Sequence, residues 1–386
     1  MKKVFPLVSL LVALALLLSA CAGAAPVAAP GAAPAAQPAA AGAQKLIWSV
    51  EGVNELPGLD PANPQNAQSI QAISLIFGGL VKLDDQLNVA PDGAESWTVS
   101  DDGTVYTFTI RDGLTFADGT PVTAQDFADS INRALQPETA SYGASWQLGH
   151  IVGANDVASG AAPAASGITV VDDRTLQITL DANVPYFLAQ LTYPVSFVVP
   201  LHAVASDPAG WTETAFGTGP FKVKEWQHNQ KLILEPNPNY WAGAPGVGEI
   251  ELPFFQDSET AYQLYRTGGL DIMGSQQNPV PSARVPEVKD SPDFHSAASF
   301  AVRYVGFNNR KAPFDDVNVR RAFAMAVDKA TLADAVLNGA VAPTDRLLPP
   351  GFTGSQLPVT GLALGSWVSF TVKVSLSETI SQPIFL

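Results

Sequence analysis

Cysteine is almost absent from this sequence, because Cys21 is the single cysteine in 386 residues. One thiol cannot form a disulfide bond within the chain, and it cannot build a cysteine-based metal site by itself. The four histidines are far apart and none belongs to an H-E-x-x-H zinc motif: His150, His202, His228 and His295. The G-x-S-x-G pattern of a serine nucleophile does not occur either. We therefore expect no enzyme activity, no metal and no cofactor.

Positive charge is also scarce: 21 lysines and arginines stand against 36 acidic residues, which gives a net charge of -15. Nucleic acid and anionic lipid would repel such a chain, so we expect neither to bind it directly. A solubilising acidic surface explains the charge better than recruitment of cationic ligands. The chain is longer than a single core usually allows and 47% of it is hydrophobic, so we expect more than one domain.

The first 43 residues carry a targeting signal and a linker. Lys2 and Lys3 precede an apolar run over residues 4–18 that is short for a membrane span. The run ends in Leu18-Ser19-Ala20-Cys21, which resembles a bacterial lipobox, so we predict a lipoprotein signal peptide over residues 1–21 with lipidation at Cys21. An ordinary signal peptide is the alternative. Residues 22–43 are nearly all alanine, proline and glycine, which predicts an extended tether, and the fold should begin near Gln44.

The stretch over residues 96–135 has the clearest local structure signals. A glycine after two aspartates at residues 101–103 lies between two alternating segments, which predicts a β-hairpin. Thr123 and Asp126 have the spacing of a capping box at the start of a helix. The residues of that helix that should face a core recur at intervals of four: Phe127, Ile131 and Leu135.

Weaker patterns predict further elements. Residues 45–50 should form the first strand, and residues 167–180 repeat the hairpin pattern, so both hairpins should join one β-rich subdomain. A helix is expected over residues 69–80, with an apolar face made of Ile70, Ile73, Ile76 and Phe77.

The C-terminal part gives mixed signals. We expect an extended segment over residues 304–308, then a helix whose core residues are Phe323 and Val327, then a second helix capped by Asp328 and ended by Asn338-Gly339. Alternating residues from Val368 to Leu376 are compatible with a strand, although a shifted or early-ended reading frame explains the tail better.

Several blocks of the sequence resemble one protein family. They are SWTVSDDG and YTFTIRDGLTFADGTPVTAQDF within residues 96–127, GTGPF at 217–221, NPNYW at 237–241 and PFDDVNVRRAF at 313–323. The blocks and their order resemble the extracytoplasmic solute-binding proteins, family 5, which serve peptide-type ABC importers. The resemblance ends beyond Gly351.

The resemblance implies an α/β, two-lobed periplasmic binding protein fold of class II, the peptide-binding type, with the second lobe incomplete in this chain. The implied divisions are lobe I over residues 44–77 and 199–300, a β-rich subdomain of lobe I over 78–198, the start of lobe II over 301–351, and a divergent tail over 352–386.

The resemblance also indicates ligand-binding residues. The loop after Leu59-Asp60-Pro61 lines the ligand cleft in the family, and so does the polar run that begins after Gly274. An aromatic residue near position 142 and one at the hinge should reach the ligand, although Gly143 could occupy the first of these positions. The candidates are Gln65, Asn66, Ala67, Gln68, Tyr142, Ser275, Gln276, Gln277 and Tyr304. Amide side chains suit a peptide backbone, because both offer donors and acceptors.

The function implied is that of a membrane-anchored, monomeric binding protein outside the cytoplasm, in the periplasm or on the outer face of the cell membrane. It would capture peptides and deliver them to the permease subunits of an ABC transporter. A different solute, such as an oligosaccharide or a nickel chelate, and a surface receptor without transport are the alternatives.

Overall fold

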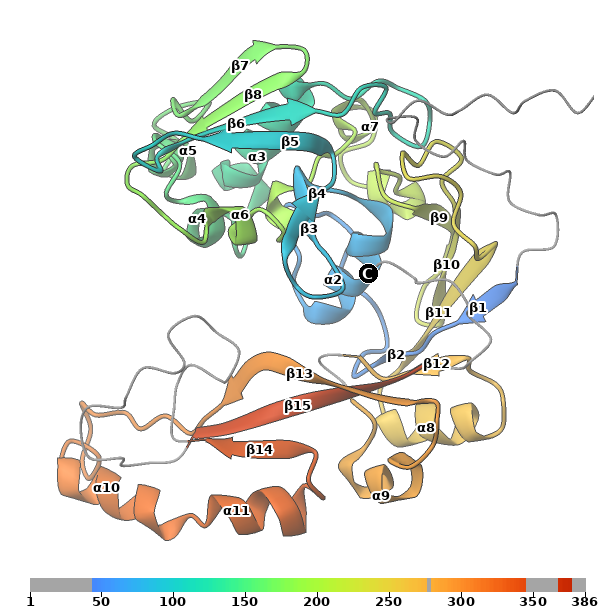
Figure 1. Cartoon of the computed structure of the whole chain (residues 1–386), viewed down its shortest axis with the longest axis vertical. Helices are drawn as coiled ribbons and strands as arrows, with labels where there is room; N and C mark the ends of the chain where they lie inside the picture. The colour runs from blue at the N-terminus through green and yellow to red at the C-terminus, as the bar shows by residue number, and fades with distance from the viewer. Residues whose placement is uncertain (1–43, 276–278, 345–366, 377–386) are drawn as a thin grey trace, which may run out of the picture. The chain divides into compact units, whose positions relative to one another are not determined.

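The computed structural model describes residues 44–275, 279–344 and 367–376, with the backbone alone for residues 296–303 and 367–376 (Figure 1). The predicted signal peptide, Cys21, the tether, Gln276, Gln277 and most of the 352–386 tail lie outside the described residues. Within the described part of the chain, no helix has the length and apolar character needed to span a bilayer.

The first sheet has five strands. In order they are β1 (Lys45–Ile47), β11 (Glu249–Phe255), β10 (Lys231–Pro236) and β9 (Phe221–Gln227), with β2 (Val50–Glu51) also paired to β11. The N-terminal strands β1 and β2 run parallel to β11, whereas β10 is antiparallel to both of its neighbours. The predicted strand over residues 45–50 is therefore confirmed as two short strands joined at Trp48 and Ser49.

Helix α2 (Ala67–Ile76) packs on this sheet and shares a core with it that includes Ile73, Ile76, Leu232, Leu234 and Ile250. The predicted bounds of 69–80 were wrong at both ends. The helix begins two residues earlier because the Asn66 side chain accepts a hydrogen bond from the Ser69 N–H at 2.8 Å. It ends earlier because Phe77 is extended and Gly78 and Gly79 follow in a space too tight for a Cβ atom.

A second sheet has the order β5 (Ala94–Val99), β6 (Val105–Ile110), β8 (Thr175–Thr179) and β7 (Ile168–Asp172). Both predicted hairpins are confirmed, and pairing of β6 with β8 joins them. Helix α3 (Ala124–Leu135) packs against this sheet, as Figure 1 shows. Its capping box is present, since the Thr123 N–H donates to Asp126 at 2.8 Å, and the three predicted core residues are buried: Phe127, Ile131 and Leu135.

Short elements complete this half of the chain. They are the hairpin β3 (Val81–Leu83) and β4 (Val89–Pro91), the helices α4 (Ala144–Leu148), α5 (Ala154–Ala158), α6 (Phe187–Gln190) and α7 (Leu201–Ser206), and the 3-10 turns η2 (Pro137–Thr139), η3 (Pro194–Ser196) and η4 (Trp211–Thr214).

The GTGPF block packs against the end of α2, and the NPNYW block contacts GTGPF. The Gly219 N–H donates to the Ile76 carbonyl at 2.9 Å, and a Cβ atom at Gly219 would lie 2.6 Å from the Ile76 carbonyl carbon. The fully buried Asn237 side chain donates to the Gly219 carbonyl at 2.7 Å. These two blocks therefore join the end of α2 to the strands β9 and β10, and their residues serve packing.

The C-terminal part contains a third sheet, in which β15 (Trp367–Leu376) pairs with β13 (Phe294–Arg303), β14 (Val341–Thr344) and β12 (Ile272–Met273) (Figure 1). The alternation after Val368 does form a strand. Residues 304–308, expected to be extended, are not part of a strand, because β13 ends at Arg303. Around this sheet lie α8 (Ser258–Arg266), α9 (Val285–Val288), α10 (Val317–Ala326), α11 (Lys329–Thr331), the 3-10 turn η5 (Ser282–Arg284) and the π-helix η6 (Leu332–Val336).

Helix α10 does not bury the residues expected of it. Phe323 is 52% exposed and Val327 is 48% exposed, so neither is a core residue. Within the described part of the chain α10 has no buried residue, and the Phe323 ring lies near the rings of Phe307 and Phe314, at 5.8 and 5.4 Å between centroids. The cap at Asp328 is confirmed, since its side chain accepts from the Thr331 N–H at 3.0 Å, and positive φ angles at Asn338 and Gly339 end the helical segment.

Candidate functional site

The loop that precedes α2 is held by an ion pair. Arg133 of α3 donates to both carboxylate oxygens of Asp60, at 3.0 and 2.5 Å. The same carboxylate accepts from the Ala62 N–H at 2.9 Å, which tightens the turn. A two-point contact between a guanidinium and a carboxylate fixes orientation as well as distance. The Leu59-Asp60-Pro61 element is therefore held to α3, and the predicted ligand loop begins directly after it.

The four loop candidates divide by exposure and contacts. Gln65 is exposed, and Asn66 is the N-cap of α2, so its side-chain oxygen is already used. Ala67 and Gln68 lie in the first turn of α2 and not in a loop. Gln68 donates its amide to the carbonyl oxygen of Glu51 at 2.9 Å. Gln65 is thus the candidate with the most open side chain, while Asn66 and Gln68 also stabilise the local structure.

Tyr142 lies beside this loop. Its N–H points to the Asn63 side-chain oxygen at 3.4 Å, and its side chain is 87% exposed. Trp146 of α4, four residues on, is 78% exposed. The pKa of the neighbouring Tyr193 is raised mainly by its own burial and secondarily by Tyr142. The structure therefore places an open aromatic side chain next to the predicted polar loop.

Ser275 directly follows Gly274, whose backbone is held by two hydrogen bonds to side chains. The Gly274 N–H donates to Glu51 Oε1 at 3.0 Å, and the Gly274 carbonyl accepts from the Trp48 indole at 3.3 Å. Gly274 has φ of 89°, which favours glycine. Ser275 is half-buried, and Gln276 and Gln277 lie outside the described residues.

Glu51 joins two of the predicted ligand segments. It accepts from Gly274 through its side chain and from Gln68 through its backbone, and its Oε1 also accepts from the Ser49 hydroxyl at 2.5 Å. Burial raises the pKa of Glu51, against the lowering effect of the hydrogen bonds from Ser49 and Gly274. Tyr304 is 60% exposed and directly follows β13, and its role stays a sequence prediction.

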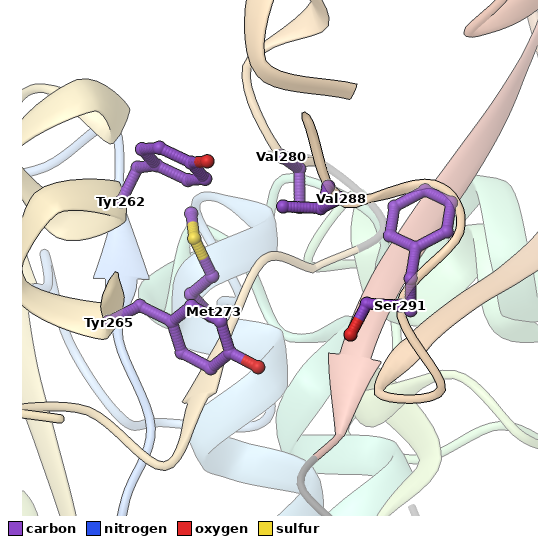
Figure 2. Close-up of a pocket in the computed structure, with 7 residues that line it drawn as sticks. Tyr262, Tyr265, Met273, Val280, Val288 and Ser291 are labelled. Carbon is purple, nitrogen blue, oxygen red and sulfur yellow. The ribbon is translucent and has the colours of Figure 1, made fainter. Parts of the chain in front are cut away.

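A small cavity lies elsewhere, between α8, α9 and the start of β13 (Figure 2). It is lined by Tyr262, Tyr265, Met273, Val280, Val288, Ser291 and Phe294, and has a volume of about 20 Å³. Such a volume holds about one water molecule. This cavity is too small for the peptide that the sequence resemblance implies as ligand. Among the described residues no group of three acidic, histidine or cysteine side chains could hold a metal ion.

Sequence reasoning missed the residues that hold these segments. Glu51 ends the apolar strand segment WSVE, and an acidic residue at such a position is a readable signal of a special role. Its partner Gly274 is 223 positions away, however, and no local pattern indicates that contact. The pairing of Asp60 with Arg133 was hidden for the same reason, because 73 positions separate them.

Residues 88–362 match the family of bacterial extracellular solute-binding proteins, family 5 Middle. The chain belongs to this family. The match runs past Gly351, where the sequence resemblance was expected to end, and it confirms the predicted family.

Named relatives agree with this assignment. The periplasmic oligopeptide-binding protein OppA of Salmonella typhimurium is 33% identical over 311 residues, which are 79% of this chain and 56% of that protein. A probable deoxycholate-binding periplasmic protein of Escherichia coli, YgiS, is 36% identical over 307 residues, or 77% of this chain and 56% of that protein. The chain thus spans about half the length of the relatives it matches.

The fold of this family 5 protein is also that of solved relatives. The murein tripeptide binding protein MppA of Escherichia coli superposes with a TM-score of 0.73 and 32% identity, over 81% of this chain and 62% of that one. The predicted α/β fold of the peptide-binding type is confirmed over this shared part.

Proposed function

We propose that this family 5 protein captures peptides outside the cytoplasm and presents them to the permease subunits of an ABC importer. The observation that carries the proposal is the convergence of the ligand-loop candidates. Asn63 contacts Tyr142, and Glu51 contacts both Gln68 and Gly274, so hydrogen bonds link three segments that are far apart in the sequence. The names of the relatives OppA and MppA support a peptide ligand.

The chemistry of the surface fits a peptide backbone. The described candidates are amide, hydroxyl and aromatic side chains, and none is an acidic or basic residue: Gln65, Asn66, Gln68, Tyr142 and Ser275. Amide groups donate and accept hydrogen bonds, as peptide groups do, and exposed aromatic rings pack on side chains of varied shape. Binding through the backbone would tolerate different peptide sequences. No residue here is assigned a catalytic role, and we propose a binding protein without enzyme activity.

Anchoring and domain division are further parts of the proposal. The lipobox-like Leu18-Ser19-Ala20-Cys21 supports a lipid anchor at Cys21, followed by the 22–43 tether, with the binding part outside the cytoplasm as a monomer. Lobe I over residues 44–77 and 199–300, its subdomain over 78–198 and the start of lobe II over 301–351 remain proposed bounds. Mass spectrometry of the N-terminal peptide tests the anchor, because a diacylglyceryl mass on Cys21 is expected and an unmodified Cys21 would contradict it.

Calorimetry with the full chain tests the ligand. Trialanine and pentaalanine should bind in the micromolar range or tighter, and Gln65→Ala and Tyr142→Ala should each weaken binding. Tyr186→Ala is the matched control, because Tyr186 is also an exposed tyrosine but lies at the N-cap of α6.

Deoxycholate is the competing ligand in the same experiment, because the relative YgiS is named for it. Displacement of pentaalanine by deoxycholate, or heat from deoxycholate alone, would favour a steroid ligand over a peptide. The absence of binding by either peptide would contradict the proposed function.

A further inference from the structure

Residues 48–51 run beside residues 272–274. Trp48 and Ile272 form a parallel bridge, and the Ser49 N–H donates to the Ile272 carbonyl at 3.2 Å. Two residues further on, β2 pairs with β11, where Glu51 lies opposite Phe255. Glu51 therefore sits between β11 and the backbone that follows β12, which puts its side chain within reach of Gly274.

Both backbone polar groups of Gly274 are hydrogen-bonded to buried side chains. Its N–H donates to Glu51 Oε1 at 3.0 Å, and its carbonyl accepts from the Trp48 indole at 3.3 Å. Glu51 is 1% exposed and Trp48 is buried, so neither contact competes with bulk water. A hydrogen bond shielded from water is stronger than the same bond at the surface. The chain direction at Ser275 is thus set by two buried side chains.

The same residue holds the other ligand segment. The Gln68 side-chain amide donates to the Glu51 carbonyl oxygen at 2.9 Å, and Gln68 lies in the first turn of α2, two residues after the Asn66 cap. Glu51 is therefore hydrogen-bonded both to the first turn of α2 and to Gly274, the residue directly before Ser275. A shift of either segment would have to move or break a hydrogen bond to Glu51.

We propose that Glu51 is a positioning residue, whose buried carboxylate and backbone carbonyl fix Ser275 and Gln68 relative to one another. The effect on a ligand rests on the proposed function, whereas the effect on Gly274 and Ser275 does not. A displacement of about 1 Å in a binding group weakens its interaction substantially. Glu51 therefore controls the affinity for the ligand through the positions of Ser275 and Gln68, without contacting the ligand itself.

The first test measures hydrogen–deuterium exchange of the full chain without ligand. Glu51→Leu removes the acceptor at similar size, and we expect faster exchange at Gly274 and Ser275 with unchanged exchange in β9 and β10. Glu51→Gln keeps a carbonyl acceptor and should restore slow exchange. Glu251→Leu is the control, because Glu251 lies on β11 and pairs with Lys45 and Lys231 instead. Unchanged exchange at Gly274 in Glu51→Leu would overturn the proposal.

The second test measures pentaalanine affinity in the same variants. Glu51→Leu should bind about tenfold more weakly, which corresponds to about 1.4 kcal/mol, and Glu51→Gln should stay close to the unmodified chain. Glu251→Leu should lower the melting temperature without changing the affinity. Equal loss in Glu51→Leu and Glu251→Leu would mean general destabilisation and would overturn the positioning role. If the unmodified chain binds no peptide, the proposed function fails, and the exchange experiment still decides the role of Glu51.

Discussion

Gly219→Ala tests whether the GTGPF block is a packing motif. A methyl group at Gly219 would lie 2.6 Å from the Ile76 carbonyl carbon, 2.7 Å from the Ile76 oxygen and 2.9 Å from the Leu75 oxygen. Carbon atoms in favourable contact keep about 3.5–4.0 Å between them. All three atoms belong to the backbone at the end of α2, so no side chain can rotate away, and either the helix end or β9 must shift.

The size of the effect follows from these contacts. Overpacking a tight site costs about 1–3 kcal/mol, and a shift also weakens the hydrogen bond from Gly219 to Ile76, whose net value is about 0.5–1.5 kcal/mol. We expect the free energy of unfolding to fall by about 1.5–4.5 kcal/mol in total. Urea unfolding followed by tryptophan fluorescence measures this, with an unchanged m-value showing that the unfolded state is unaltered.

Gly246→Ala is the matched control. No heavy atom lies within 4 Å of the position of its Cβ atom, and its φ is not positive, so alanine fits without strain. We expect a change within about 0.5 kcal/mol. If Gly219→Ala also stays within that limit, the close approach of the GTGPF block to α2 is wrong, and the block would need another explanation.

Three other substitutions address the contacts around the site. Arg133→Met leaves the Asp60 carboxylate without its guanidinium, and unfolding in urea should show a loss of about 1.5–3 kcal/mol that shrinks when Asp60 is already asparagine. Asn66→Ala removes the cap of α2 and should cost about 1 kcal/mol, whereas Asn66→Asp should retain most of the stability. Two carboxylates raise the pKa of His228, so the charged imidazole stabilises the fold. This stabilisation is fully present below pH 6.5 and is lost as the pH rises through the raised pKa. The two carboxylates belong to Glu213 and Glu55. His228→Gln should therefore lower the melting temperature near about pH 6 and have little effect near about pH 9. Equal effects at both pH values would refute a role for the positive charge.

Local signals predicted the local structure well. The hairpin at residues 101–103 needs a glycine with positive φ, and Gly103 has φ of 73°. The capping box at Thr123 depends on residues three apart, and spacing alone places Phe127 and Ile131 on one face. These features were predictable because their causes lie within a few residues of their effects.

Features with distant causes were not predictable in this way. The end of α2 depends on Gly78 and Gly79, whose missing side chains leave room for Asp92 and Phe197 from other parts of the chain. The spacing of Phe323 indicates an apolar face, but a pattern cannot say whether another element covers it. In the described residues it stays half-exposed, so the periodicity was real and the inference of burial was wrong.

In the proposed site, the residues that hold the structure differ from the residues proposed to contact a ligand. Asp60 with Arg133 holds the loop, Asn63 holds the backbone of Tyr142, and Glu51 holds both Gln68 and Gly274. Gln65 and Tyr142 are different residues, and their side chains are exposed.

This separation has a consequence for sequence change. A substitution at an open position alters what a ligand meets without disturbing buried hydrogen bonds, so it should change affinity and leave stability nearly constant. A substitution at a supporting residue leaves a buried or half-buried polar group unpaired, which should both lower stability and displace the proposed ligand surface. Comparing Tyr142→Ala with Arg133→Met by both urea unfolding and pentaalanine affinity separates the two classes. If Tyr142→Ala destabilised the fold as much as Arg133→Met does, its ring would be part of the support, and the surface for a ligand would have to lie elsewhere.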